Sequence, residues 1–142
     1  GIYTVLVDGD DFNEPVADAA RSILDGHIVL TRKLASQNHF PSIDVLESKS
    51  RVRDHIINDA QRRAGSALLR LEAAYREKED LIMVGAYQKG SDAYVDAAIL
   101  YRERTLEFLR QRPEETSPYG DTHTALAKIA DAIEASVAMA RR

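Results

Sequence analysis

The sequence is short of several features that define common functional classes. It contains no cysteine and no tryptophan, and aromatic residues make up only 6% of its 142 positions. Without cysteine there is no disulfide framework, which fits a reducing compartment such as the cytosol. No apolar run approaches the ~20 residues that cross a bilayer, and no signal-peptide pattern opens the sequence. We therefore expect a cytoplasmic chain without a membrane-spanning helix.

Several kinds of catalytic machinery are also missing. No Gly-x-x-x-x-Gly-Lys-Ser/Thr loop occurs, so the chain cannot cradle nucleotide phosphates in the usual way. No spacing of serine, histidine and aspartate indicates nucleophilic catalysis, and there is no cysteine to supply it. We also expect no metal site, because the histidines show no metal-ligand spacing such as two on one helix face. The four histidines are His27, His39, His55 and His123.

Positive charge is not clustered along the chain. The net charge is −4, and residues 1–50 carry eight Asp or Glu against four Lys or Arg, whereas residues 51–142 carry fifteen of each kind. Binding of nucleic acid needs clustered basic residues, so we expect no nucleic-acid partner. The acidic excess instead makes residues 1–50 the part that would meet a basic protein partner.

The sequence does contain enough apolar material for a folded core. Hydrophobic residues make up 44% and charged residues 30%, which excludes a disordered acidic tail. A chain of this length forms one domain, or a small domain that carries a piece of a second. We expect two parts, residues 1–53 and residues 54–142, because the apolar pattern changes to a helical period at that point.

Residues 1–53 carry short strand and helix signals. Residues 3–7 are aromatic and β-branched without polar alternation, which predicts a strand buried on both faces. A short helix is expected next, capped by Asn13 and closed by Gly26 in the left-handed conformation. The apolar face of this helix would consist of Val16, Ala19, Ala20 and Ile23.

A second strand is expected over residues 27–31, followed by a brief helical turn through Leu34. Asn38 would end this turn, because asparagine tolerates the left-handed conformation that follows a helix end. Pro41 then favours an extended path, because its ring fixes the backbone angle. The extended segment is expected to cover residues 43–46.

From about Asp54 onward, apolar residues recur at three- and four-residue steps, which predicts a long helix. Gly85 marks the break after this helix, and Asp92 is expected to cap the next one. The second helix would stop near Pro113, since proline cannot continue a helix.

A linker over residues 116–120 separates the second helix from a third. Asp121 or Thr122 is expected to cap the third helix. No internal repeat is present, so the second part is expected to be a small bundle and not a solenoid. The buried face of the third helix would consist of Leu126, Ile129, Ile133, Val137 and Ala140.

Three runs in the first third of the chain resemble a known family. In their order and spacing they resemble the closing part of a hexameric ATPase core. The specific match is to the flagellum-specific ATPase of type III protein export, a relative of the F-type catalytic subunit. The resemblance is strong over residues 2–51, moderate to about residue 111 and negligible beyond Pro113. The three runs are residues 3–11 (YTVLVDGDD), 24–32 (LDGHIVLTR) and 39–51 (HFPSIDVLESKSR).

The resemblance implies a fold and a function. The fold would be an α/β piece of a P-loop ATPase core over residues 1–53, followed by an α-helical C-terminal bundle over residues 54–142, mostly α. The full-length parent would use ATP and Mg²⁺ in a cytoplasmic homohexamer, peripheral at the inner face of the membrane, to drive export of flagellar proteins. Implied partners are a central stalk protein, export chaperone–substrate complexes and the export gate. This segment alone is expected to hold no nucleotide and to be inactive.

Arg51 is the candidate catalytic residue. In phosphoryl transfer, a cation from a neighbouring subunit stabilises the negative charge on the γ-phosphate, and arginine suits this because its planar fork stays protonated and can meet two oxygens. By itself, an arginine before a helix is usually a solvated surface residue. The resemblance implies a different role, because a Ser-x-Ser-Arg element supplies the arginine finger in trans in that family. Ser48-Lys-Ser-Arg51 falls at its place.

Two further assignments come from the same resemblance. Phe40 precedes Pro41 where the family usually has tyrosine, and it resembles the aromatic that stacks on adenine; a core aromatic beside a turn proline is the alternative. Asp10, Asp11 and Glu14 form an acidic loop, which is either a solvated turn with a favourable charge at a helix N-terminus or, as the resemblance implies, a loop facing the central pore and its stalk.

Three interpretations of the function stay open. The first is a segment of a flagellar export ATPase, which the run GAYQKGSD at residues 85–92 favours. The second is a segment of the injectisome ATPase of virulence secretion. The third is a non-enzymatic helical adaptor that binds a coiled-coil partner. Residues 85–92 are either an ordinary turn between helices or a loop that touches a partner.

Overall fold

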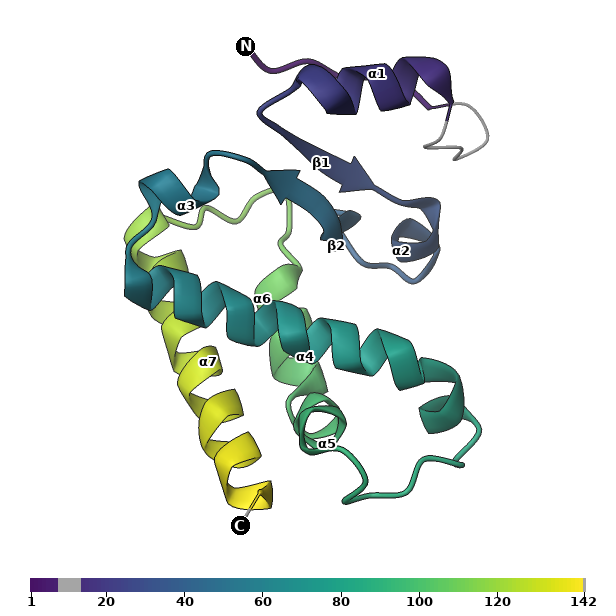
Figure 1. Ribbon diagram of the computed structural model, residues 1–142, viewed down its shortest axis with the longest axis vertical. Coiled ribbons are helices and arrows are strands. Elements are labelled where there is room, and N and C mark those ends of the chain that lie inside the picture. Colours follow the sequence, from purple (N-terminus) through teal and green to yellow (C-terminus); the bar gives the residue numbers. More distant parts are fainter. Residues whose placement is uncertain (8–13, 142) are drawn as a thin grey trace. The chain divides into compact units, whose positions relative to one another are not determined.

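The computed structural model describes residues 1–7 and 14–141, and these form two compact units. The first unit covers residues 1–55 and the second covers residues 56–142. Figure 1 shows two short strands in the first unit and long helices in the second. The expectation of a short α/β piece followed by a helical part, mostly α, is confirmed.

The first unit is built on an antiparallel pair of strands, β1 (Gly26–Leu30) and β2 (Ile43–Ser50). Helix α1 (Pro15–Ile23) precedes β1, and the short helix α2 (Arg32–Ser36) lies between the strands in the chain. Both strands and the helical turn were predicted, although β2 runs four residues further than expected, to Ser50. Asn38 follows α2 with a φ of 56°, which confirms its left-handed role.

The strand predicted over residues 3–7 is wrong. These residues have no regular secondary structure, and Leu6 is 91% exposed. A strand is stabilised by hydrogen bonds to a neighbour, and in the part of the chain that the structure describes the only sheet is the β1–β2 pair. The apolar pattern of residues 3–7 therefore has no strand beside it to pair with.

Helix α1 confirms the predicted helix but not its boundaries or its buried face. Its N-cap position is Glu14, and Asn13, the predicted cap, lies outside the described residues. Ala17 is buried, whereas Ile23, predicted on the buried face, is 80% exposed. The predicted face is solvent-facing because an apolar stripe is buried only where another element covers it.

Gly26 is required for a different reason from the one predicted. Its φ does not lie in the left-handed range; the two glycines with positive φ among the described residues are Gly85 and Gly90. A Cβ atom built at Gly26 would lie 2.8 Å from the backbone oxygen of Lys49, on β2. Glycine at this position therefore permits the close approach of the two strands.

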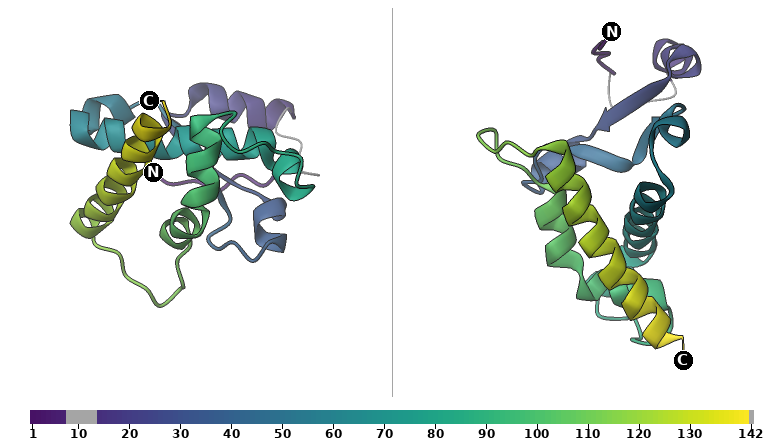
Figure 2. Two further views of the ribbon diagram at one scale, coloured as in Figure 1. Left: turned by 90° about the horizontal axis from the view of Figure 1, so that it is seen from below. Right: turned by 90° about the vertical axis from the view of Figure 1, so that its left-hand side faces the viewer.

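The second unit consists of four main helices, which are α4 (Asp59–Met83), α5 (Ala93–Leu100), α6 (Arg102–Leu109) and α7 (Tyr119–Ala140). In Figure 2, α6 (green) runs beside α7 (yellow). The core of the unit is drawn from α4, α5 and α7, whose apolar stripes face one another. Its members are Leu68, Leu71, Ala97, Ala98, Ile129, Ile133 and Val137.

The helix boundaries from residue 53 onward correct the prediction in three places. A short helix α3 (Arg53–Ile56) ends before α4 begins, and Asn58 caps α4. The single helix predicted up to Pro113 is two helices, α5 and α6, with a break at Tyr101. Helix α7 begins at Tyr119, earlier than the predicted caps, and Ala140 at its end is exposed.

A partly buried ion pair ties α4 to α6. Nη1 of Arg102 donates to both carboxylate oxygens of Glu72, at 2.9 and 3.0 Å. The guanidinium carbon of Arg102 also lies 4.1 Å from the centre of the Tyr75 ring, a cation–π contact. Both partners come from α4, so Arg102 holds the break at Tyr101 against this helix.

Candidate functional site

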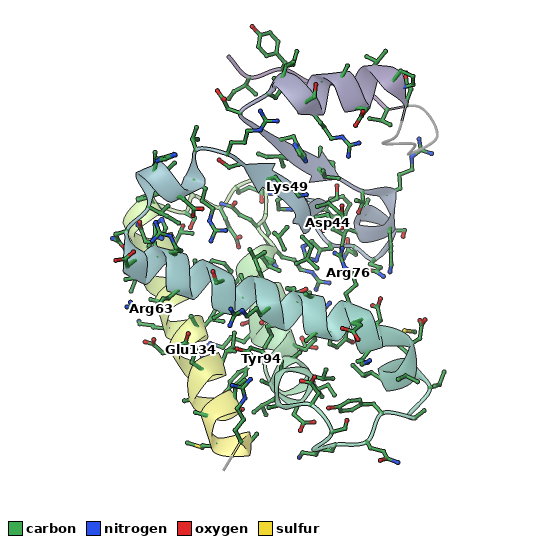
Figure 3. The ribbon with its side chains drawn as sticks, viewed as in Figure 1. Asp44, Lys49, Arg63, Arg76, Tyr94 and Glu134 are labelled. Carbon is green, nitrogen blue, oxygen red and sulfur yellow. The ribbon has the colours of Figure 1, made fainter. Side chains whose placement is uncertain are left out.

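Strand β2, which ends directly before the candidate residue Arg51, contains an irregularity. The strands pair normally at Val29↔Asp44 and again at His27↔Lys49. Between these pairs, β1 contributes one residue and β2 contributes residues 45–48, so β2 bulges. Figure 3 labels Asp44 and Lys49, which lie on β2 at the two ends of this bulge.

Side chains supply the hydrogen bonds that the bulge interrupts. Asp44 is only 7% exposed, and its Oδ1 accepts from the backbone N–H groups of Leu46 and Glu47, at 3.0 and 3.2 Å. The hydroxyl of Ser48 donates to the backbone oxygen of Asp44 at 2.7 Å and accepts from the N–H of Val29 at 3.0 Å. Ser48 therefore joins the two strands across the bulge.

Arg51 follows directly after β2 and is held at two points. Its backbone N–H donates to the oxygen of Asp25 at 2.7 Å, which extends the pairing with β1 by one bond. Its Nη2 donates to the backbone oxygen of Ser22 at 2.9 Å, while the residue as a whole is exposed. A guanidinium has five N–H donors, so this single bond orients the group and leaves donors for an anionic ligand.

Phe40 projects from the turn between α2 and β2. Asn38 reverses the chain there, and the N–H of His39 donates to the oxygen of Leu34 at 3.0 Å. His39 is buried at 5% exposure, whereas Phe40 is 52% exposed. Burying an imidazole and exposing a phenyl ring is the reverse of the usual preference. Within the described residues, Phe40 is therefore not packed into the core.

The acidic loop is described only at its end. Asp10 and Asp11 lie outside the described residues. Glu14 is half-buried, and its backbone oxygen accepts from the N–H of Asp18 at 2.9 Å, as the N-cap residue of α1. Among residues 1–7 and 14–141, no group of three or more histidine, cysteine, aspartate or glutamate side chains could hold a metal ion.

In the second unit, the loop over residues 85–92 has an internal framework. Gly85 and Gly90 adopt φ values of 71° and 91°, which favour glycine. The hydroxyl of Tyr87 lies 3.1 Å from both the backbone oxygen of Asp92 and Oδ1 of Asp96, and Oδ2 of Asp96 accepts from the N–H of Gly90 at 2.8 Å. This loop is therefore held by the side chain of Tyr87, within the loop, and by that of Asp96 on α5.

The predicted cap of α5 is confirmed. Oδ1 of Asp92 accepts from the N–H groups of Tyr94 and Val95, at 2.7 and 3.2 Å. On the other side of the loop, Met83 and Val84 at the end of α4 are exposed. The fixed loop is therefore preceded in the chain by an exposed apolar pair at the end of α4.

Electrostatic perturbation is slight in the second unit. The pKa of Lys78 is raised because its ammonium donates a hydrogen bond to Glu77, and the negative charge of Glu77 adds to the effect. Nζ of Lys78 lies 2.8 Å from Oε1 of Glu77. Both side chains are on the surface, where water screens such pairs.

No helix in the described residues is both long and apolar enough to cross a bilayer.

Two family comparisons cover most of the chain. Residues 57–128 match the family described as the T3SS EscN ATPase C-terminal domain, and residues 1–50 match the ATP synthase alpha/beta family, nucleotide-binding domain. The chain belongs to the type III secretion ATPase family. The predicted resemblance to export ATPases is confirmed. The expectation that it becomes negligible beyond Pro113 is wrong, because the family match continues to residue 128.

Curated relatives of this ATPase family come from both of its branches. The chain is 50% identical over 127 residues to the flagellum-specific ATP synthase of Treponema pallidum, covering 89% of this chain and 28% of that protein. It is 48% identical over 120 residues to the type 3 secretion system ATPase of Sinorhizobium fredii, covering 84% of this chain and 27% of that protein. The chain thus spans less than a third of the length of these relatives.

Solved structures of the family share the fold. The assembled ATPase EscN of enteropathogenic E. coli superimposes with a TM-score of 0.86 at 43% identity, covering 90% of this chain and 31% of that one. The structure of EscN in complex with its central stalk EscO gives a TM-score of 0.78 at 42% identity, covering 82% of this chain and 29% of that one. The roles of Arg51, Phe40 and the acidic loop stay predictions.

Proposed function

We propose that this chain is the C-terminal part of the ATP-hydrolysing subunit of a type III export machine, and that Arg51 is its arginine finger. The observation that carries the proposal is how Arg51 is held and exposed in a chain of this family. The residue is anchored to Asp25 and Ser22 at the end of β2, yet its side chain is exposed. An arginine finger needs this combination of fixed direction and accessibility.

In this proposal, Arg51 stabilises the negative charge that develops in the transition state. Phosphoryl transfer spreads charge over the γ-phosphate oxygens, and a finger supplied by a neighbouring subunit accelerates turnover about a thousandfold or more. The relative EscN has been solved as an assembled ATPase, which supports subunit interfaces of this kind. ATP and Mg²⁺ would be held by the phosphate-binding loop of the full-length subunit, since no such motif occurs in residues 1–142.

The same proposal assigns the neighbouring features. Phe40 stacks on the adenine ring, a role that its exposure supports because a base needs an open ring face. The acidic residues Asp10, Asp11 and Glu14 face a central stalk, and the solved complex of EscN with its stalk EscO supports a stalk partner. The boundary between the ATPase core and the helical C-terminal domain falls at residues 53 and 54. The helical domain and its loop over residues 85–92 meet export partners.

Mixed hexamers of the full-length subunit test the finger in trans. Subunits with Arg51→Ala, and subunits whose phosphate-binding lysine is changed to alanine, are each expected to lose about a thousandfold or more in turnover. Mixing the two kinds before assembly creates interfaces in which an intact phosphate site meets an intact Arg51, so part of the turnover should return. Equilibrium binding of an ATP analogue to the Arg51→Ala subunits should stay near the wild-type value.

Arg53→Ala is the matched control, because Arg53 lies two residues away on α3. This variant should keep its turnover. Near-normal turnover of Arg51→Ala, or a mixture that recovers nothing, would contradict the assignment. Arg51→Lys should also be slow, since an ammonium keeps the charge but cannot reproduce the fork.

Within the family we propose the flagellar branch, because residues 85–92 carry the run GAYQKGSD. The injectisome branch is the alternative, and complementation of a strain that lacks its flagellar ATPase separates the two. A helical adaptor without ATPase activity is the third interpretation. A phosphate-binding loop about 150 to 200 residues before Gly1 in the parent gene would exclude it, by analogy with the usual size of a P-loop core.

A further inference from the structure

We propose that Ser48 is a positioning residue, whose hydroxyl bridge across the β2 bulge sets the direction in which Arg51 points. The inference rests on the proposed function of Arg51. The hydroxyl of Ser48 accepts a hydrogen bond from the N–H of Val29 at 3.0 Å and donates one to the backbone oxygen of Asp44 at 2.7 Å. It therefore links β1, the first half of β2 and the bulge through one atom.

The bridge matters because the strand pairing beyond the bulge is short. Only two residue pairs, His27↔Lys49 and Gly26↔Ser50, separate the bulge from Arg51. In a strand, a slip of one residue turns every side chain to the opposite face. Two pairs specify a register weakly, so the number of residues held inside the bulge decides which face Arg51 occupies.

Three side chains fix that number, and that of Ser48 is the one that reaches β1 from inside the bulge. Asp44 Oδ1 holds the turn at Leu46 and Glu47 from within β2. Nε2 of His27 lies 3.2 Å from the backbone oxygen of Glu47, reaching the bulge from the β1 side. Ser48 supplies the acceptor that the N–H of Val29 lacks where the ladder is interrupted. Removing the hydroxyl frees this N–H and loosens the bulge.

The experiment compares Ser48→Ala, Ser48→Thr and Arg51→Ala with the double variant Ser48→Ala/Arg51→Ala in the full-length ATPase. Saturating turnover and equilibrium binding of an ATP analogue are measured for each. Ser36→Ala serves as the matched control, because Ser36 is exposed on α2 in the same unit and bonds only to the oxygen of Lys33 in the described residues. These variants separate a role that acts through Arg51 from a general loss of stability.

Ser48→Ala should lower saturating turnover about tenfold, the size expected when one hydrogen bond that aligns a catalytic group is lost. Its affinity for the ATP analogue should not change, and Ser48→Thr should restore turnover because threonine keeps the hydroxyl. The double variant should be no slower than Arg51→Ala alone, since a positioning residue has nothing left to position.

Turnover of Ser48→Ala equal to that of Ser36→Ala would overturn the inference, as would a double variant whose losses multiply. Normal turnover of Arg51→Ala would instead refute the proposed function itself, and the two failures are thus distinct. If Ser48→Ala does not assemble, Ser48→Thr and Ser48→Val decide the matter, because they share a shape and differ in the hydroxyl. A fast threonine variant beside a slow valine variant supports the bridge, and equal turnover rejects it.

Discussion

At the scale of single residues, the neighbours His39 and Phe40 show how an apolar side chain can be kept out of a core. The left-handed Asn38 reverses the chain, after which His39 turns inward and Phe40 outward. Hydrophobicity alone would favour the opposite arrangement. A phenyl ring that the described residues leave half-exposed is open to a ligand, which agrees with the proposed stacking on adenine.

Phe40→Ala should weaken nucleotide binding to the full-length ATPase by ~1–3 kcal/mol, the usual worth of a stack between a base and an aromatic ring. Saturating turnover should change much less, because the stack is present both before and in the transition state. Michaelis constants for ATP and GTP measure the effect, and both should rise because any purine offers a ring face.

Phe40→Tyr should bind like the wild type, since tyrosine keeps the flat ring. Ile28→Ala is a matched control, because Ile28 is an exposed apolar residue on β1 of the same unit. Michaelis constants that do not move in Phe40→Ala would make Phe40 a structural residue of the turn.

At the scale of helices and strands, local signals were readable and pairing was not. Asn38, the cap Asp92 and the break at Gly85 were predicted because each acts within a few residues of its own position in the chain. The strand predicted over residues 3–7 failed because its pattern says nothing of a partner strand. The β2 bulge could not be predicted either. The alternation of side chains along a strand does not show that the hydroxyl of Ser48 replaces a backbone acceptor for the N–H of Val29.

One missed boundary had a signal in the sequence. The pair Asn58-x-x-Gln61 is a capping box, in which each side chain bonds the backbone N–H of the other residue, at 2.9 and 3.0 Å. Apolar periodicity placed the start of this helix near Asp54, before the box. Reading caps together with periodicity would have separated α3 from α4.

Asn58→Ala should lower the free energy of unfolding of the helical unit by about 1 kcal/mol, the usual cost of losing an N-cap. Asn58→Asp should remain close to the wild type, because its carboxylate also accepts from the N–H of Gln61. Urea denaturation followed by circular dichroism measures both variants. A loss in Asn58→Ala below about 0.3 kcal/mol would show that packing of α4 holds its first turn without the cap.

At the scale of the whole chain, family membership and fold class were predictable because the order and spacing of the three runs can be recognised in the sequence itself. For the site, candidate residues could be named from the sequence, but their arrangement could not be predicted. Its geometry depends on contacts between residues far apart in the chain, such as Arg51 with Ser22 and Ser48 with Val29. One prediction for the whole chain therefore comes from what the sequence lacks, a phosphate-binding loop.

The isolated chain of 142 residues should hydrolyse no ATP and bind it weakly at best. Phosphate binding needs a cradle of backbone donors and a lysine that the sequence does not supply, and an arginine finger without that cradle has no developing charge to stabilise. A coupled ATPase assay and calorimetric titration test this, with circular dichroism to verify the helices of the second unit. Turnover above a buffer blank, or calorimetric binding in the micromolar range, would contradict the prediction.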